Sequence, residues 1–173
     1  MSTSQEAEQL YQILNADAVH PAVLEGLQNY SADSKNELVA RVAQTFEPAP
    51  PPRVLARLLF LLTDENRTGV TTAFLVNLRS PYPEARKACL YGLQKLEYPA
   101  IIELALHALR DEDDQVVAAA CDLLLLKAKQ DLQLWTLLQQ VYAARKATKG
   151  FHLTNSLLEA HNIEQPMPDP DHK

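Results

Sequence analysis

Two cysteines, five histidines and a run of acidic residues are the side chains of this sequence with the widest chemical repertoire. Cys89 could act as a nucleophile if its thiol were accessible and ionised. His152 and His161 could share a metal ion with Glu159 on one helix surface. The acidic run Asp111–Asp114 could bind calcium. Each of these interpretations depends on the element that holds the residues.

A structural interpretation is favoured in each case. Cys89 occupies a helix position that holds leucine or alanine in the equivalent segments of the chain, which favours a small core residue. The nine-residue separation of His152 and His161 is a poor ligand spacing on one helix. The acidic run lacks the alternating ligands and the glycine of a calcium loop, and acidic residues suit the start of a helix. No GxGxxG, GxxxxGK, HExxH or CxxC pattern occurs, so we expect no catalytic residue, no metal and no cofactor.

The chain is organised by a repeat of 31 residues. Pro21, Pro52 and Pro83 recur at this interval, and Asp114 takes the fourth position. Apolar residues then follow at helical spacing and form one stripe along each segment. The stripe consists of Val23, Leu27, Tyr30 and Ser31; Val54, Leu58, Leu61 and Leu62; Ala85, Cys89, Gly92 and Leu93; and Val116, Ala120, Leu123 and Leu124. A fixed period in this range indicates an array of helical hairpins that cover one another's apolar stripes.

The periodicity predicts ten helices in five hairpins and no strand. The repeated prolines are expected to begin second helices, because proline suits the first helical turn. Ser34 is expected to cap the following helix, in a capping box with Glu37. The clearest predicted bounds are Glu6–Leu14, Pro52–Leu62, Gln115–Lys127, Leu132–Ala144 and Gly150–His161.

One position of the second helices is expected to let neighbouring helices approach closely. It holds the small residues Gly26, Ala88 and Ala119. Arg57 occupies the same position in the second repeat, and the sequence offers no reason for it.

The segment Pro83-Glu84-Ala85-Arg86, followed by Cys89, Gly92 and Leu93, resembles the HEAT repeat family. The second helix of that family begins near Asp-x-x-Pro-x-Val-Arg-x-x-Ala-x-x-Ala-Leu, and the resemblance covers residues 20–130. It implies an all-α, armadillo-like α-solenoid: a right-handed α-α superhelix of about five hairpins. We expect one such domain over residues 1–162 and a disordered tail over 163–173, a segment rich in proline.

The family's ladder of aspartate and arginine residues is mostly missing. Leu55 and Val117 replace the arginine, and Tyr82 takes an aspartate position. The resemblance leaves one expected rung, from Arg86 to the aspartates at 111 or 113.

The composition indicates an ordinary globular domain. The 173 residues are 47% apolar and 22% charged, with a net charge of −6 that argues against general binding of a phosphate backbone. The N-terminus lacks the basic and apolar regions of a signal peptide, and no apolar run reaches the length of a membrane span. We therefore expect a cytoplasmic protein with reduced cysteines and no membrane partner.

The leading functional hypothesis is a noncatalytic protein-interaction or scaffold module that binds another protein on the concave face. One column outside the apolar stripe contains Phe60 and Tyr91, and exposed aromatic residues mixed with arginine are typical of binding hot spots. Alternatively, Phe60 packs against the first-helix layer and only Tyr91 is exposed. The predicted partner-binding residues are Arg53, Arg57, Phe60, Lys87, Tyr91 and Asp122.

Two other functions follow from the resemblance alone. Short HEAT-type proteins include the phycobilin lyase or chaperone-like proteins of the E/F type, which attach or detach a tetrapyrrole on an antenna protein. Their glycine- and aspartate-rich turns are missing from this sequence. HEAT-like DNA glycosylases of the alkylation-repair type would require the basic residues from Arg53 to Arg86 to share one face, and the acidic total disfavours DNA as a partner.

Overall fold

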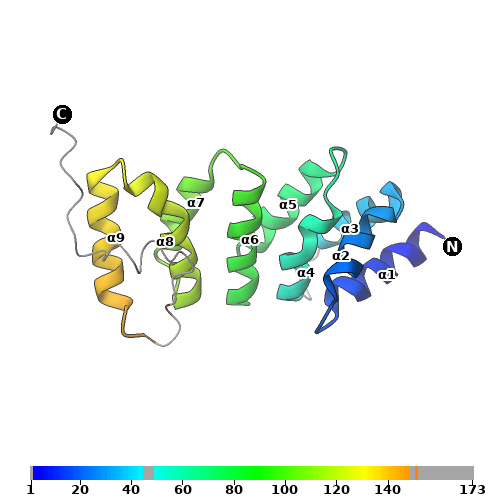
Figure 1. The fold of residues 1–173 in the computed structure, drawn as a ribbon, viewed down its shortest axis with the longest axis horizontal. Helices are drawn as coiled ribbons and strands as arrows, with labels where there is room; N and C mark the ends of the chain where they lie inside the picture. Colours follow the sequence, from blue (N-terminus) through cyan, green and yellow to red (C-terminus); the bar gives the residue numbers. More distant parts are fainter. Residues whose placement is uncertain (1, 45–48, 149–150, 152–173) are drawn as a thin grey trace. The chain divides into compact units, whose positions relative to one another are not determined.

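The computed structural model describes residues 2–44, 49–148 and 151. Over this part of the chain the protein is all-α, as predicted, with nine α-helices, two short 3₁₀ segments and no strand (Figure 1). The sequence predicted ten helices, and the tenth, Gly150–His161, lies outside the described residues together with the expected tail. The chain divides into two compact units, Met1–Tyr98 and Pro99–Lys173.

The first unit contains two rows of helices. The helix α3 packs against both α1 and α5 in one row, while α4 packs against α6 and η1 against η2 in the other. Contacts of α1 with α4 and of α5 with α6 join the rows. In chain order the elements are α1 (Thr3–Asn15), α2 (Pro21–Gly26), η1 (Leu27–Asn29), α3 (Ala32–Gln44), α4 (Pro52–Arg57), η2 (Leu58–Leu61), α5 (Arg67–Asn77) and α6 (Pro83–Lys95).

The second unit is built around one buried helix. It contains α7 (Ile101–Ala108), α8 (Asp114–Ala128) and α9 (Leu132–Arg145), and α8 packs against both of the others (Figure 1). The side chain of Asp113 caps α8 by accepting a hydrogen bond from the backbone N–H of Gln115 at 2.9 Å. The acidic run therefore begins a helix, as predicted.

Helix starts follow the sequence prediction at the prolines and depart from it at Ser34. Pro21, Pro52 and Pro83 are each the first residue of a helix. The helix α3 begins earlier than expected, because the Oγ of Ser31 accepts the backbone N–H of Ser34 at 3.3 Å. The predicted cap at Ser34 is wrong for a physical reason: the Ser34 hydroxyl instead donates to Glu6 Oε2 at 2.8 Å and so joins α3 to α1.

The predicted apolar stripe forms the core of both units. The members Val54, Leu58, Leu61, Ala85, Cys89, Leu93, Val116, Ala120 and Leu124 are all at most 1% exposed. The first repeat departs from this pattern, since Val23 is 45% exposed and Ser31 is also exposed. Val23 lies on α2, the first helix of its row in the part of the chain that the structure describes, so no earlier helix covers it.

Close helix approach occurs at a different glycine from the one expected. A Cβ atom on Gly26 would meet no atom within 4 Å, so the small residue is not needed there. A Cβ on Gly92 would lie 2.4 Å from Cζ of Phe74, which is fully buried on α5. Gly92 therefore makes the space that the Phe74 ring occupies between α5 and α6.

Candidate functional site

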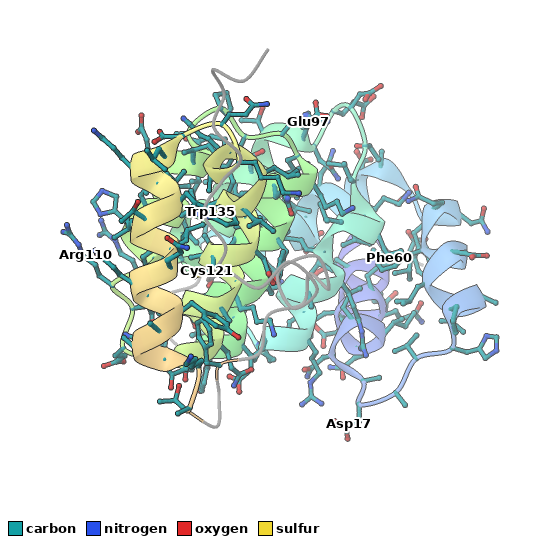
Figure 2. All side chains as sticks on the ribbon, turned by 60° about the vertical axis from the view of Figure 1, so that its left-hand side comes forward. Asp17, Phe60, Glu97, Arg110, Cys121 and Trp135 are labelled. Atoms are coloured by element: carbon teal, nitrogen blue, oxygen red, sulfur yellow. The ribbon has the colours of Figure 1, made fainter. Side chains whose placement is uncertain are left out.

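Phe60 is the most exposed of the aromatic side chains that were expected to bind a partner. Phe60 lies on η2 (Figure 2). Leu58 and Leu61 on the same segment are fully buried, yet 39% of the Phe60 surface is accessible. The Gln28 side chain holds the backbone of η2 in place, because its Nε2 donates a hydrogen bond to the Phe60 carbonyl oxygen at 2.8 Å. Of the two alternatives left by the sequence, the structure favours an exposed Phe60.

Lys87 and Tyr91 lie four residues apart on α6 and so share one face of that helix. Both are half-buried. The helix α4, which continues into η2 and Phe60, packs against α6. We refer to Phe60, Lys87 and Tyr91 together as the Phe60 surface.

Arg53 and Arg57 both bind the end of α1 and the loop that follows it. Arg57 Nη1 donates to the carbonyl oxygens of Leu14 at 2.9 Å and Ala16 at 2.7 Å. These carbonyls belong to the last turn of α1 and its C-cap, where intrahelical donors run out. Arg57 thus caps α1, which explains why an arginine stands at a position otherwise held by small residues.

The exposed Arg53 makes a weaker set of contacts in the same region. Its Nε donates to Asn15 Oδ1 at 2.9 Å, and its guanidinium pairs with the carboxylate of Asp17, which is itself largely exposed. Exposed ion pairs of this kind contribute little to stability. Both arginines that were expected to bind a partner therefore have partners within the chain.

Asp122, the last of the predicted partner-binding residues, belongs to the second unit and is half-buried on α8. Its participation in a binding surface stays a prediction. The same applies to the expected rung from Arg86 to Asp111 or Asp113, whose members belong to different units. Within the first unit, Arg86 Nη1 donates to the Ser80 carbonyl oxygen at 2.9 Å.

A charged contact that the sequence analysis missed joins α8 to α9. Arg145 Nη1 lies 2.5 Å from Asp114 Oδ1, and Nη2 donates to the Asp111 carbonyl oxygen at 3.2 Å. Asp114 takes the fourth position of the 31-residue register and Arg145 the fifth, so the register itself could have identified this pair. The hydrogen bond from Arg145 holds the pKa of Asp114 below its usual value.

Both cysteines are buried thiols. Cys89 has no exposed surface and Cys121 only 2%. Burial raises the pKa of Cys121 to about 12, and it raises the pKa of Cys89 well above the usual range of a thiol. Because the thiolate is the reactive form, these positions favour core packing over nucleophilic chemistry.

Metal-ligating side chains do not gather in the described parts of the chain. No group of three or more His, Cys, Asp and Glu residues there could hold a metal ion. The histidines at 152, 161 and 172 lie outside those parts. Among the described helices, none combines the length and the apolar character needed to cross a membrane.

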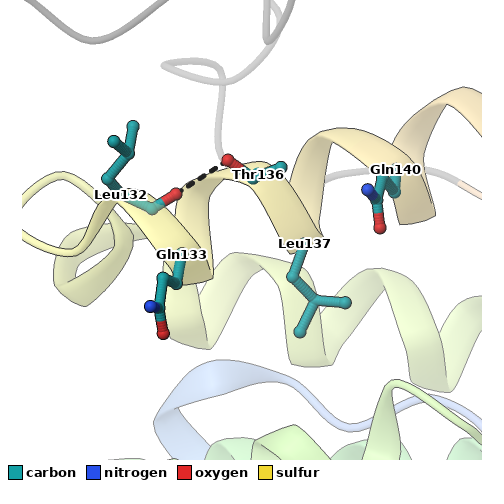
Figure 3. Close-up of a pocket in the computed structure, with 5 residues that line it drawn as sticks. All are labelled: Leu132, Gln133, Thr136, Leu137 and Gln140. Carbon is teal, nitrogen blue, oxygen red and sulfur yellow. Dashed lines mark hydrogen bonds between the residues drawn. The ribbon is translucent and has the colours of Figure 1, made fainter.

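The outer side of α9 contains an open depression of about 400 Å³ that the sequence analysis did not anticipate. Among the described residues, those that line it belong to α9, and Figure 3 shows them: Leu132, Gln133, Thr136, Leu137 and Gln140. Trp135 is on the same helix but is only 7% exposed, which places it in the core of the second unit.

Comparison with known proteins adds no further assignment. No protein-family model matches the chain, and neither a curated protein sequence nor a solved structure matches it.

Proposed function

We propose that the protein is a noncatalytic protein-interaction module made of HEAT-like helical hairpins, and that it binds another protein through the Phe60 surface. The reduced, buried cysteines suit the cytoplasm as its location. The proposal uses only residues of the first unit.

The exposure of Phe60 is the observation that supports this proposal best. A phenylalanine side chain stabilises a fold by about 1.5–3 kcal/mol when fully buried. On the same 3₁₀ segment, Leu58 and Leu61 are fully buried. Leaving a large aromatic ring partly in water forgoes much of that gain. Aromatic anchors that a partner can cover are typical centres of protein interfaces.

Phe60 and Tyr91 stand one repeat apart in the sequence. Phe60 lies on η2, which directly follows α4, and Tyr91 lies on α6, which packs against α4. Lys87 adds a positive charge one turn before Tyr91 on α6. A partner with an apolar side chain and a nearby acidic group would complement this surface.

Affinity capture with substituted baits tests the proposal. The full chain and its Phe60→Ala/Tyr91→Ala variant serve as baits in an extract of the native source, and recovered proteins are compared by quantitative mass spectrometry. Removing two hot-spot side chains costs about 2 kcal/mol or more, so we expect recovery of the true partner to fall by at least ~10-fold.

Tyr82→Ala is the matched control, because Tyr82 is also an exposed aromatic residue of the first unit. Thermal unfolding of each bait shows whether it remains folded, and Phe60→Ala alone serves if the half-buried Tyr91 proves necessary for folding. Equal recovery of the same proteins by the wild type and the Phe60 variants would contradict the proposed surface.

No observation favours the bilin-lyase alternative. The DNA-binding alternative loses support, because Arg53 and Arg57 bind residues of α1 and the loop after it.

A further inference from the structure

The backbone that carries Phe60 is held by two side-chain amides. Phe60 and Leu61 stand at the end of η2, where the last carbonyl oxygens of a helix have no intrahelical donor. Gln28 Nε2 donates to the Phe60 carbonyl oxygen at 2.8 Å, and Asn66 Nδ2 donates to the Leu61 carbonyl oxygen at 2.9 Å. The two peptide planes that follow the Cα atom of Phe60 are therefore each held by a donor from outside η2.

The two amides have different roles. Asn66 is only 5% exposed, and its Oδ1 also accepts the backbone N–H of Thr63 at 2.8 Å, so this side chain shapes the turn that ends η2. Gln28 is exposed and lies on η1, which contacts η2. Asn66 thus acts within its own turn, whereas Gln28 reaches from one 31-residue segment to the next.

The backbone of Gln28 is itself held by a buried lysine. Lys35 on α3 is only 4% exposed, and its Nζ donates to the Gln28 carbonyl oxygen at 2.8 Å. A hydrogen bond from a charged donor is stronger than one between neutral groups. Leu27, the residue before Gln28, is fully buried. Two hydrogen bonds therefore connect a buried side chain of α3, through Gln28, to the backbone of Phe60.

We infer, on the basis of the proposed function, that Gln28 is a positioning residue of the Phe60 surface: it holds the backbone of η2 so that the exposed ring is ordered before a partner binds. With its backbone fixed, Phe60 retains only the rotations about its two side-chain torsion angles. The partner then freezes less conformational freedom when it binds, and this preorganisation increases the affinity.

Gln28→Met removes the proposed role with little change in size, because methionine has a similar length and no N–H donor. Ordering one side chain costs an amount that corresponds to a change of about 3–10-fold in the dissociation constant, and we expect Gln28→Met to weaken partner binding by this factor. Gln9→Met is the matched control, since Gln9 is also an exposed glutamine of the first unit but lies on α1. It should leave partner binding unchanged.

Backbone amide NMR relaxation of the isolated full-length chain tests the positioning without a partner. The order parameters of Phe60 and Leu61 should be near 0.85 in the wild type and should fall toward about 0.6 in Gln28→Met. The midpoint of thermal unfolding should change little, because a single exposed hydrogen bond contributes little to stability. Equal order parameters in the wild type and in Gln28→Met would overturn the inference.

A double-mutant cycle with a captured partner separates positioning from an independent contact of Gln28. The recovered protein that depends most on Phe60 is purified, and its affinity is measured for the wild type, Gln28→Met, Phe60→Ala and the double variant. Gln28→Met should weaken binding in the wild-type chain and have no effect in Phe60→Ala, because no ring is left to position. Equal weakening in both backgrounds, or none in the wild-type chain, overturns the inference and leaves the proposed function standing. If no recovered protein depends on Phe60, the proposed function fails and the inference fails with it.

Discussion

Replacing Gly92 by alanine measures how tightly α5 and α6 pack. The added Cβ would lie 2.4 Å from Cζ of Phe74 and 2.6 and 2.7 Å from the two Cε atoms, whereas ordinary contacts begin near 3.4 Å. The tip of the ring must therefore move by about 1 Å. Because Phe74 has no exposed surface, the ring has no open direction into solvent, and neighbouring core side chains must move with it.

Two effects of opposite sign decide the stability of Gly92→Ala. Alanine favours a helix interior over glycine by about 0.8–1.0 kcal/mol. Overpacking a well-filled core costs about 1–3 kcal/mol, and contact with three ring carbons suggests the upper part of that range. We expect a net loss of about 1–2 kcal/mol in the free energy of unfolding.

Gly26→Ala is the matched control, because a Cβ at this helical glycine enters open space. It should raise the free energy of unfolding by about 0.4–1 kcal/mol, so the two variants should differ by about 1.4–3 kcal/mol. Urea unfolding followed by far-UV circular dichroism measures both, and both glycines belong to the first unit. The double variant Gly92→Ala/Phe74→Leu should be more stable than the sum of its single changes, because the shorter side chain relieves the clash. Equal stability of Gly92→Ala and Gly26→Ala would refute this account of the packing.

Three further predictions concern single side chains. Arg57→Ala should lower the free energy of unfolding by about 1–3 kcal/mol, because two carbonyls at the end of α1 lose their donor. Arg53→Ala should change the free energy of unfolding by less than about 1 kcal/mol, because the Arg53 ion pair is exposed. Urea unfolding of the two variants measures the difference. Hydrogen bonds from Ser34 and Ser31 lower the pKa of Glu6 in the folded protein, so the contribution of Glu6 to stability is present above its unfolded pKa and is lost as the pH falls through its folded pKa. The melting temperature should therefore decline less steeply with falling pH in Glu6→Gln than in the wild type. Identical profiles of melting temperature against pH would contradict this prediction. Cys89 and Cys121 should react with a thiol reagent only after the protein is denatured, and prompt reaction of the native chain would show that they are accessible.

The sequence pattern predicted those features that depend on local spacing. Helix starts at Pro52 and Pro83 follow from the fixed backbone angle of proline and its missing N–H, which need no knowledge of distant residues. Burial of Leu58 and Cys89 follows from the apolar stripe, because neighbouring helices cover equivalent positions. Val23 departs from the stripe because burial also depends on a neighbouring helix that covers the residue, and the described part of the chain holds no earlier helix in its row.

The repeat pattern could not predict features that depend on contacts between particular residues on different helices. The fit of Phe74 over Gly92 joins two positions that do not share a column, so aligning the repeats does not reveal it. The sequence offered no reason for Arg57 because its partners are backbone carbonyl oxygens. Every residue has such a carbonyl, so residue types do not reveal this contact. Of the predicted binding residues, the exposure of Phe60 was left open by the sequence because the ring could reach either water or the first-helix row.

The cap that Arg57 places on α1 has a consequence for the modularity of the chain. Its guanidinium comes from α4 and the carbonyl oxygens from the end of α1. A swap, duplication or deletion of either 31-residue segment would separate the two halves of this contact and leave an arginine where the equivalent positions hold glycine or alanine. The repeated segments are therefore alike in pattern without being interchangeable, and their order along the chain is part of what the sequence specifies.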